Sequence, residues 1–255
     1  MQCSSCGQQT AEGKFCTNCG AELGKDDRYE AVADSTVSTS PSTNQNPNET
    51  VEKLKTTGSN FGHFFVTLVK NPSEAKKANG SDMSSGIITF VLFSLVIALS
   101  YHLILSTIQI GFFMQITFLD SFILPFIIFT ILYLLIAGLT FAGAKLSVQA
   151  VTFPDVIAKY GAYLVPFLLL FTAGILFWLI GITSIAGLLL LLSILSTLLI
   201  APTFILVEQT PNGFDRIYVL IGLHIIILLV FGFFIQSFMD SMLGNFMNMM
   251  FNSGF

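Results

Sequence analysis

Charged residues are scarce in this chain of 255 residues: they make up 10% of it, whereas hydrophobic residues make up 53%. A typical globular domain has about 25% charged residues, because its core needs a polar shell. The shortage excludes an ordinary soluble domain. The formal net charge is also small, at −4, so the overall charge gives no argument for a nucleic-acid partner or for an acidic substrate.

The few charges and cysteines are concentrated at one end of the chain. Residues 1–81 contain 8 of the 11 Lys and Arg residues and all four cysteines, whereas residues 83–255 contain three basic and five acidic side chains. The N-terminus also lacks the apolar core of a signal peptide. We therefore expect a polar head in the reducing cytosol, where cysteines bind metal more readily than they form disulfides.

The four cysteines form two C-x-x-C pairs, Cys3 with Cys6 and Cys16 with Cys19, each followed by a glycine. Four thiolates complete a closed, structural zinc site, and about 20 residues cannot bury a core without such a metal. The alternative is a redox-active C-x-x-C, which two pairs so close together disfavour. The spacing predicts one structural Zn²⁺ bound by Cys3, Cys6, Cys16 and Cys19.

Residues 3–23 resemble the short zinc ribbon, a β-hairpin with metal knuckles, found at the N-termini of many bacterial membrane proteins. The resemblance is carried by the first C-x-x-C-G and by Phe15-Cys16-x-x-Cys19-Gly20-x-x-Leu23. Such ribbons bind protein or nucleic acid in other settings. Only three basic residues lie near this one, against five acidic residues, so residues 1–24 are predicted to dock a protein and no nucleic acid.

Between the head and the apolar body lie two further segments. Residues 25–50 are rich in Ser, Thr, Asn and Pro and predict a flexible linker. In residues 51–80, Leu54, Phe61 and Leu68 recur every seven positions among lysines, which predicts an amphipathic juxtamembrane helix. Two interpretations stay open: the helix lies on an anionic membrane face, or it packs on the membrane-spanning bundle.

The body, residues 83–238, is predicted to be an all-α polytopic membrane domain. A spanning helix needs about 20 apolar residues, and this criterion places five spans near 87–108, 122–144, 161–180, 184–207 and 217–237. The run from Tyr160 to Val207 has no charge over 48 positions. As one helix it would be roughly 72 Å long, more than twice the hydrocarbon core, so it must fold back near Gly181.

The five-span arrangement predicts an orientation. It places all 11 Lys and Arg residues on one side of the membrane. The segments on the other side, residues 109–121, 181–183 and 239–255, contain no Lys or Arg. By the positive-inside rule, we expect a cell-membrane protein with a cytoplasmic N-terminus and an extracytoplasmic C-terminus. The Met- and Phe-rich tail 239–255 is expected to form an interfacial helix on the outer leaflet, and residues 110–119 a short interfacial piece.

Residues 153–166 read FPDVIAKYGAYLVP. They resemble the loop-to-helix signature of Yip1-type membrane proteins: a Phe, a helix start, a small/aromatic pair, then a Pro within the next span. The resemblance implies a Yip1-like domain of five spans with a cytosolic N-terminus. Eukaryotic members of that family act in vesicle traffic and contact small GTPases.

Polar groups within the spans are few. All five acidic residues after position 83 fall at span edges or in loops, so we expect no buried carboxylate that marks an ion path. His102 and His224 differ by about 12 Å in depth, so we expect two separate polar helix contacts and no shared metal site. We predict that helices approach closely at five small residues: Gly138, Ala142, Gly143, Ala158 and Ala162. We predict kinks in the third and fourth spans at Pro166 and Pro202.

No motif for a hydrolase, a phosphate-binding loop or a zinc protease occurs in the chain, so we predict no catalytic residues and no enzyme. The expected function is a non-enzymatic scaffold, regulatory or membrane-organising protein. Its expected partners are the lipid bilayer and a cytosolic or membrane protein. The alternative is a small transporter or channel in which Pro166 and Pro202 act as hinges.

Overall fold

The computed structural model describes residues 47–107, 117–147 and 151–252. The predicted zinc ribbon with Cys3, Cys6, Cys16 and Cys19 lies outside these ranges, as do residues 25–46 of the predicted linker and most of the predicted interfacial piece at 110–119. Every regular element within the described ranges is helical.

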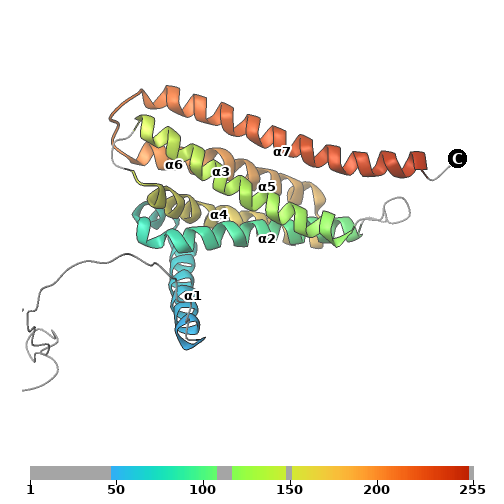
Figure 1. Cartoon of the computed structure of the whole chain (residues 1–255), viewed down its shortest axis with the longest axis horizontal. Helices are drawn as coiled ribbons and strands as arrows, with labels where there is room; N and C mark the ends of the chain where they lie inside the picture. Colours follow the sequence, from blue (N-terminus) through green and yellow to red (C-terminus); the bar gives the residue numbers. More distant parts are fainter. Residues whose placement is uncertain (1–46, 108–116, 148–150, 253–255) are drawn as a thin grey trace, which may run out of the picture. The chain divides into compact units, whose positions relative to one another are not determined.

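Five helical segments are long and apolar enough to cross a membrane, as predicted: Gly80–Thr107, Leu119–Ser147, Phe153–Leu179, Thr183–Glu208 and Arg216–Ser237. They correspond to α2 (Met83–Thr107), α3 (Leu124–Ser147), α4 (Phe153–Leu179), the pair α5 (Thr183–Leu195) and α6 (Ala201–Glu208), and α7 (Arg216–Asn252). Short helical turns precede α2 and α3, and a π-helical turn, η5 (Ser196–Ile200), joins α5 to α6. Successive spans run antiparallel (Figure 1).

The predicted fold-back between the third and fourth spans is confirmed. Gly181 adopts a φ of 86°, a left-handed conformation that closes a helix and that glycine adopts without strain. Its N–H donates to the Trp178 carbonyl, and the N–H of Ile182 donates to the Phe177 carbonyl. The apolar run therefore forms a tight hairpin.

The segment before the first span forms α1 (Pro47–Lys70) and two 3₁₀ turns, η1 (Pro72–Lys77) and η2 (Gly80–Asp82). We call residues 47–82 the juxtamembrane collar. Helix α1 begins at Pro47, inside the predicted linker, and extends sideways from the bundle (Figure 1). Leu68 is buried in the bundle's core, while Val66 and Val69 on the adjoining face are exposed. The last turns of α1 thus pack on the bundle, and an apolar strip of the helix remains uncovered.

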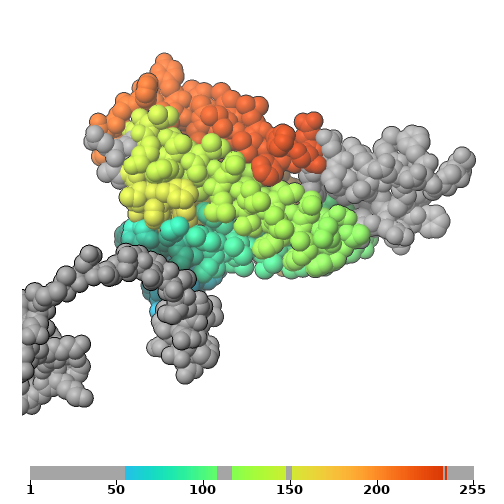
Figure 2. All heavy atoms as spheres, viewed as in Figure 1, coloured from blue at the N-terminus to red at the C-terminus, as the bar shows by residue number. Residues whose placement is uncertain are grey.

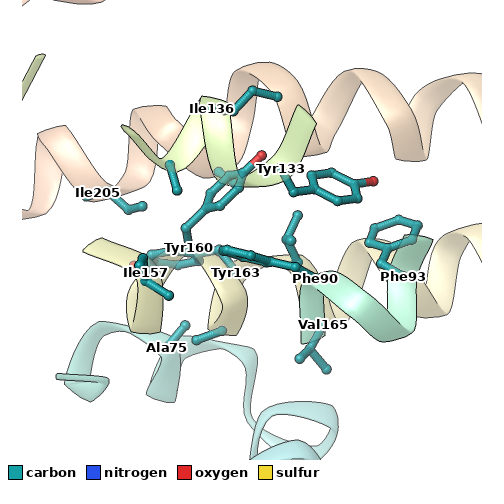
Figure 3. Close-up of a cluster of buried hydrophobic side chains, with 14 of the residues drawn as sticks. Ala75, Phe90, Phe93, Tyr133, Ile136, Ile157, Tyr160, Tyr163, Val165 and Ile205 are labelled. Carbon is teal, nitrogen blue, oxygen red and sulfur yellow. The ribbon is translucent and has the colours of Figure 1, made fainter. Parts of the chain in front are cut away.

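Aromatic rings fill the interior of the bundle where α2, α3 and α4 meet (Figure 3). Phe90 and Phe93 of α2, Tyr133 of α3 and Tyr160 of α4 are each at most 1% exposed. Ring centroids lie 5.4 Å apart between Phe90 and Tyr160, and 5.5 Å apart between Phe93 and Tyr133. These distances are typical of favourable aromatic pairs, so the rings form a packed layer between these three helices.

Helices α2 and α4 approach until their backbones touch, at Gly86 and Gly161. A Cβ atom added to Gly161 would lie 2.3 Å from the Gly86 Cα, and one added to Gly86 would lie 2.5 Å from the Ile157 carbonyl oxygen. Ala158 and Ala162, predicted as contact residues, are fully buried on α4. Gly138 was wrongly predicted to be a close contact, because nothing lies within 4 Å of its Cβ position.

Helix α7 packs along α3 on the face shown in Figure 2. It continues without a break over 37 residues, a length of about 55 Å. Residues 239–252 therefore extend the helix of the fifth span, and the separate interfacial helix that we expected there is not formed.

Candidate functional site

The described cationic side chains close to the spans gather at one end of the bundle, which we call the cationic end. Helices α2, α4 and α7 begin there, and α3 and α6 end there (Figure 1). The connection between α6 and α7 is fixed to the end of α3, because the N–H groups of Asn212 and Phe214 donate to the carbonyls of Ser147 and Leu146. The residues concerned are Lys70, Lys76, Lys77, Lys145, Lys159 and Arg216.

The collar is attached to this end by a shared carboxylate. Thr152 and Asp155 form a capping box at the start of α4, in which each side chain bonds the other residue's backbone N–H. The second carboxylate oxygen of Asp155 accepts a hydrogen bond of 2.7 Å from the Gly80 N–H. One residue therefore starts the third span and holds the collar against it.

Lys159 and Glu208 form an ion pair between α4 and α6. The Lys159 ammonium lies 3.0 Å from Oε1 of Glu208, and the two side chains are only 12% and 19% exposed. The Tyr163 hydroxyl donates to the other oxygen, Oε2, across 3.1 Å. A charge withdrawn from water needs both a partner and further hydrogen bonds, and this carboxylate has them.

Glu208 lies at the end of the fourth span, as predicted, and its side chain is only partly withdrawn from water, but the ion pair itself was not predicted. The signal was present in the sequence: Lys159 and Glu208 are the residues immediately before and after the charge-free run. Because that run folds into a hairpin, its two ends meet. Opposite charges at those ends predict an ion pair.

A cavity of ≈ 580 Å³ lies beside the ion pair, within the range of small-molecule sites. Ser73 and Lys76 of η1 line it together with Glu208, whereas Pro166, Phe167 and Phe204 supply apolar walls. Sequence reasoning placed Pro166 as a hinge, and the structure places it on the wall of this cavity. The cavity joins a polar rim to an apolar interior.

Two neighbouring lysines of η1 differ in their partners. Lys77 pairs with Glu74, with 2.9 Å between the ammonium and the carboxylate. Lys76 lines the cavity and makes no ion pair within the part of the chain that the structure describes. The positive charge at the cavity rim is therefore uncompensated by the described side chains.

The fourth span carries a π-helical turn at residues 196–200, next to Pro202. The Ala201 N–H donates to the Ser196 carbonyl and not to the Thr197 carbonyl, as it would in an α-helix. Pro202 has no N–H to donate. The Thr197 carbonyl therefore lacks a helical donor, and the buried Tyr160 hydroxyl supplies one across 3.0 Å. The π turn and Pro202 together thus leave a carbonyl of the fourth span to which α4 bonds.

The two histidines make separate polar contacts, as predicted. Nδ1 of His102 lies 2.8 Å from the Ser121 hydroxyl, between the first and second spans. Nε2 of His224 on α7 lies 3.1 Å from the Leu199 carbonyl oxygen and 3.0 Å from the Thr203 hydroxyl, between the fourth and fifth spans. No group of three potential metal ligands occurs among the described residues, and the four-cysteine zinc site stays a prediction.

The chain is similar to protein YvbI of Bacillus subtilis (strain 168), which carries the description "uncharacterized protein". The two are 27% identical over 242 residues, which cover 93% of this chain and 96% of YvbI. No known family model matches the chain, and no solved structure matches it. The similarity extends over nearly the whole of both proteins.

Proposed function

We propose that this protein is a non-enzymatic, membrane-organising scaffold whose cationic end faces the cytosol and presents a zinc-bound head to a protein partner. One observation carries the proposal: the collar is built into the bundle. Leu68, Ala75 and Ala78 of the collar belong to the same buried cluster as the spans, and Gly80 bonds to Asp155. The end of α1 that leads into the first span is thereby fixed at the cationic end.

The orientation follows from charge. Cationic loops resist translocation, and six of the described basic residues lie at the cationic end. In the five-span arrangement, the basic residues of the head fall on the same side. The head, with Cys3, Cys6, Cys16 and Cys19, is then cytosolic, where thiols stay reduced and available to zinc.

A structural role suits the zinc. Two C-x-x-C pairs supply four thiolates and leave no open coordination position for a reacting water. Two resemblances support a folded docking module that is tethered to a multi-span membrane body. Residues 3–23 resemble a zinc ribbon, and residues 153–166 resemble the Yip1 signature.

The rival function is a small transporter, and the cavity beside Pro166 favours it. Against it stands the aromatic layer of Phe90, Phe93, Tyr133 and Tyr160, which fills the interior between α2, α3 and α4. Substituted-cysteine labelling along residues 184–207 separates the two functions. A scaffold predicts labelling confined to the two ends of the fourth span, and a transporter predicts a labelled stripe along its length.

Crosslinking in native membranes, followed by mass spectrometry, tests the docking role. The protein with intact cysteines is compared with one in which Cys3, Cys6, Cys16 and Cys19 are all serine. We expect protein crosslinks from residues 1–30 in the first and their loss in the second, at equal membrane insertion. Identical crosslinks from both forms would contradict a zinc-dependent docking module.

A further inference from the structure

We propose that the cavity at the cationic end binds one anionic glycerophospholipid, with its phosphate at Lys76 and the start of an acyl chain between Phe167 and Phe204. The proposal concerns the leaflet that the cationic end faces and does not depend on the docking role of the head. Basic pockets between spanning helices are known binding places for anionic lipid head groups.

The balance of charge at the cavity favours an anion. Glu208, the acid in its wall, is neutralised by Lys159 at 3.0 Å and bonded by Tyr163. Lys77 is neutralised by Glu74. Lys76 lines the cavity and has no anionic partner among the described side chains, so one positive charge is left at the rim. The Ser73 side chain beside it adds a hydrogen-bond donor.

The order of polarity in the cavity favours a lipid over a free anion. Tyr163 and Phe167 are one helical turn apart on α4, and Glu208 and Phe204 are one turn apart on α6, so the wall changes from polar to apolar over about 6 Å. Phe204 is 46% exposed. An inorganic anion would gain nothing from these rings, whereas an acyl chain buries its methylenes against them.

The location also fits a lipid. Phe167 and Phe204 belong to the third and fourth spans, and the Lys76 turn lies outside the spans, in the collar. A phospholipid in its own leaflet presents its phosphate and acyl chains in the same order.

The test uses the full chain in nanodiscs of phosphatidylcholine that contain a minor fraction of spin-labelled phosphatidylglycerol or spin-labelled phosphatidylcholine. Electron paramagnetic resonance measures the immobilised fraction of each label. We expect preferential immobilisation of phosphatidylglycerol, and Lys76→Gln should lower that preference about fivefold, the usual effect of one basic residue at an anionic bilayer. Lys77→Gln is the matched control and should leave most of the preference intact.

Equal losses in Lys76→Gln and Lys77→Gln, or no preference in the unmodified protein, would overturn the proposal. Displacement of the label by millimolar inorganic phosphate or glycerol phosphate would overturn it too, since the site would then hold a soluble anion. A phosphatidylglycerol with a photoreactive group near the top of its acyl chain gives an independent readout. We expect adducts within residues 163–167 or 204–208, and adducts confined to other helices would reject the site.

Discussion

The Lys159 ammonium lies 3.0 Å from the Glu208 carboxylate, and these two residues bound a run of 48 uncharged positions. The run forms the hairpin of the third and fourth spans, and the ion pair closes it at the cationic end. Tyr163, one turn inside Lys159, adds a hydrogen bond to the same carboxylate. One cluster therefore fixes the register of the two helices and forms part of a cavity wall.

Glu208→Gln should destabilise the protein by about 1–3 kcal/mol, because it leaves the Lys159 ammonium largely withdrawn from water without its ion-pair partner. The thermal midpoint in a fixed detergent should fall. Glu74→Gln breaks the more exposed Glu74–Lys77 pair and should change the midpoint little. Equal midpoints for the two variants would contradict the assigned role of the Lys159–Glu208 pair.

Gly161→Ala should be more harmful than its size suggests. The added methyl would lie 2.3 Å from the Gly86 Cα, so α2 and α4 must separate, at a cost of about 1–3 kcal/mol. Gly138→Ala adds the same methyl where nothing lies within 4 Å and should have no such effect. Comparing the yield of monodisperse protein and the thermal midpoint for the two variants checks this, and a stable Gly161→Ala protein would contradict the crossing.

Tyr160→Phe removes the hydroxyl that satisfies the Thr197 carbonyl beside the π turn. A buried carbonyl without a partner costs about 1–3 kcal/mol, so we expect a lower thermal midpoint. Tyr218→Phe is the control, since that side chain is 77% exposed. If both variants keep the midpoint of the unmodified protein, the hydroxyl does not stabilise the bulged helix.

Cys16→Ser should release the zinc predicted at the four cysteines and unfold the head, because metal binding supplies the folding energy of so small a module. Membrane insertion should be unaffected. Elemental analysis of the purified protein should give one zinc per chain, and less than that in the variant. Absence of zinc from the unmodified protein would contradict the site.

The number and order of the spans could be predicted because each depends on apolar length alone. The fold-back at Gly181 could be predicted because 48 uncharged residues exceed the bilayer thickness. The partial packing of α1 on the bundle was one of two open interpretations, since a sequence stripe shows that a face is apolar but not what covers it.

The contacts between spans were harder to predict. Small residues occur at several positions, and sequence periodicity does not show that Gly161 meets Gly86 while Gly138 meets nothing within 4 Å. The π turn before Pro202 depends on which carbonyl a backbone N–H donates to, and the residue types in the segment do not predict that choice. The ion pair between Lys159 and Glu208 could have been predicted, because the predicted hairpin already placed both residues at the same end.

The central claim is that the cationic end faces the cytosol and holds the cysteine-rich head there. Paired topology reporters test it most directly: one fused after Ser147, at the end of the second span, and one after Phe255. The account predicts activity from a cytosolic reporter only at Ser147, and from an extracytoplasmic reporter only after Phe255. A cytosolic signal from the fusion after Phe255 would contradict the orientation, and with it the proposed place of the zinc-bound head.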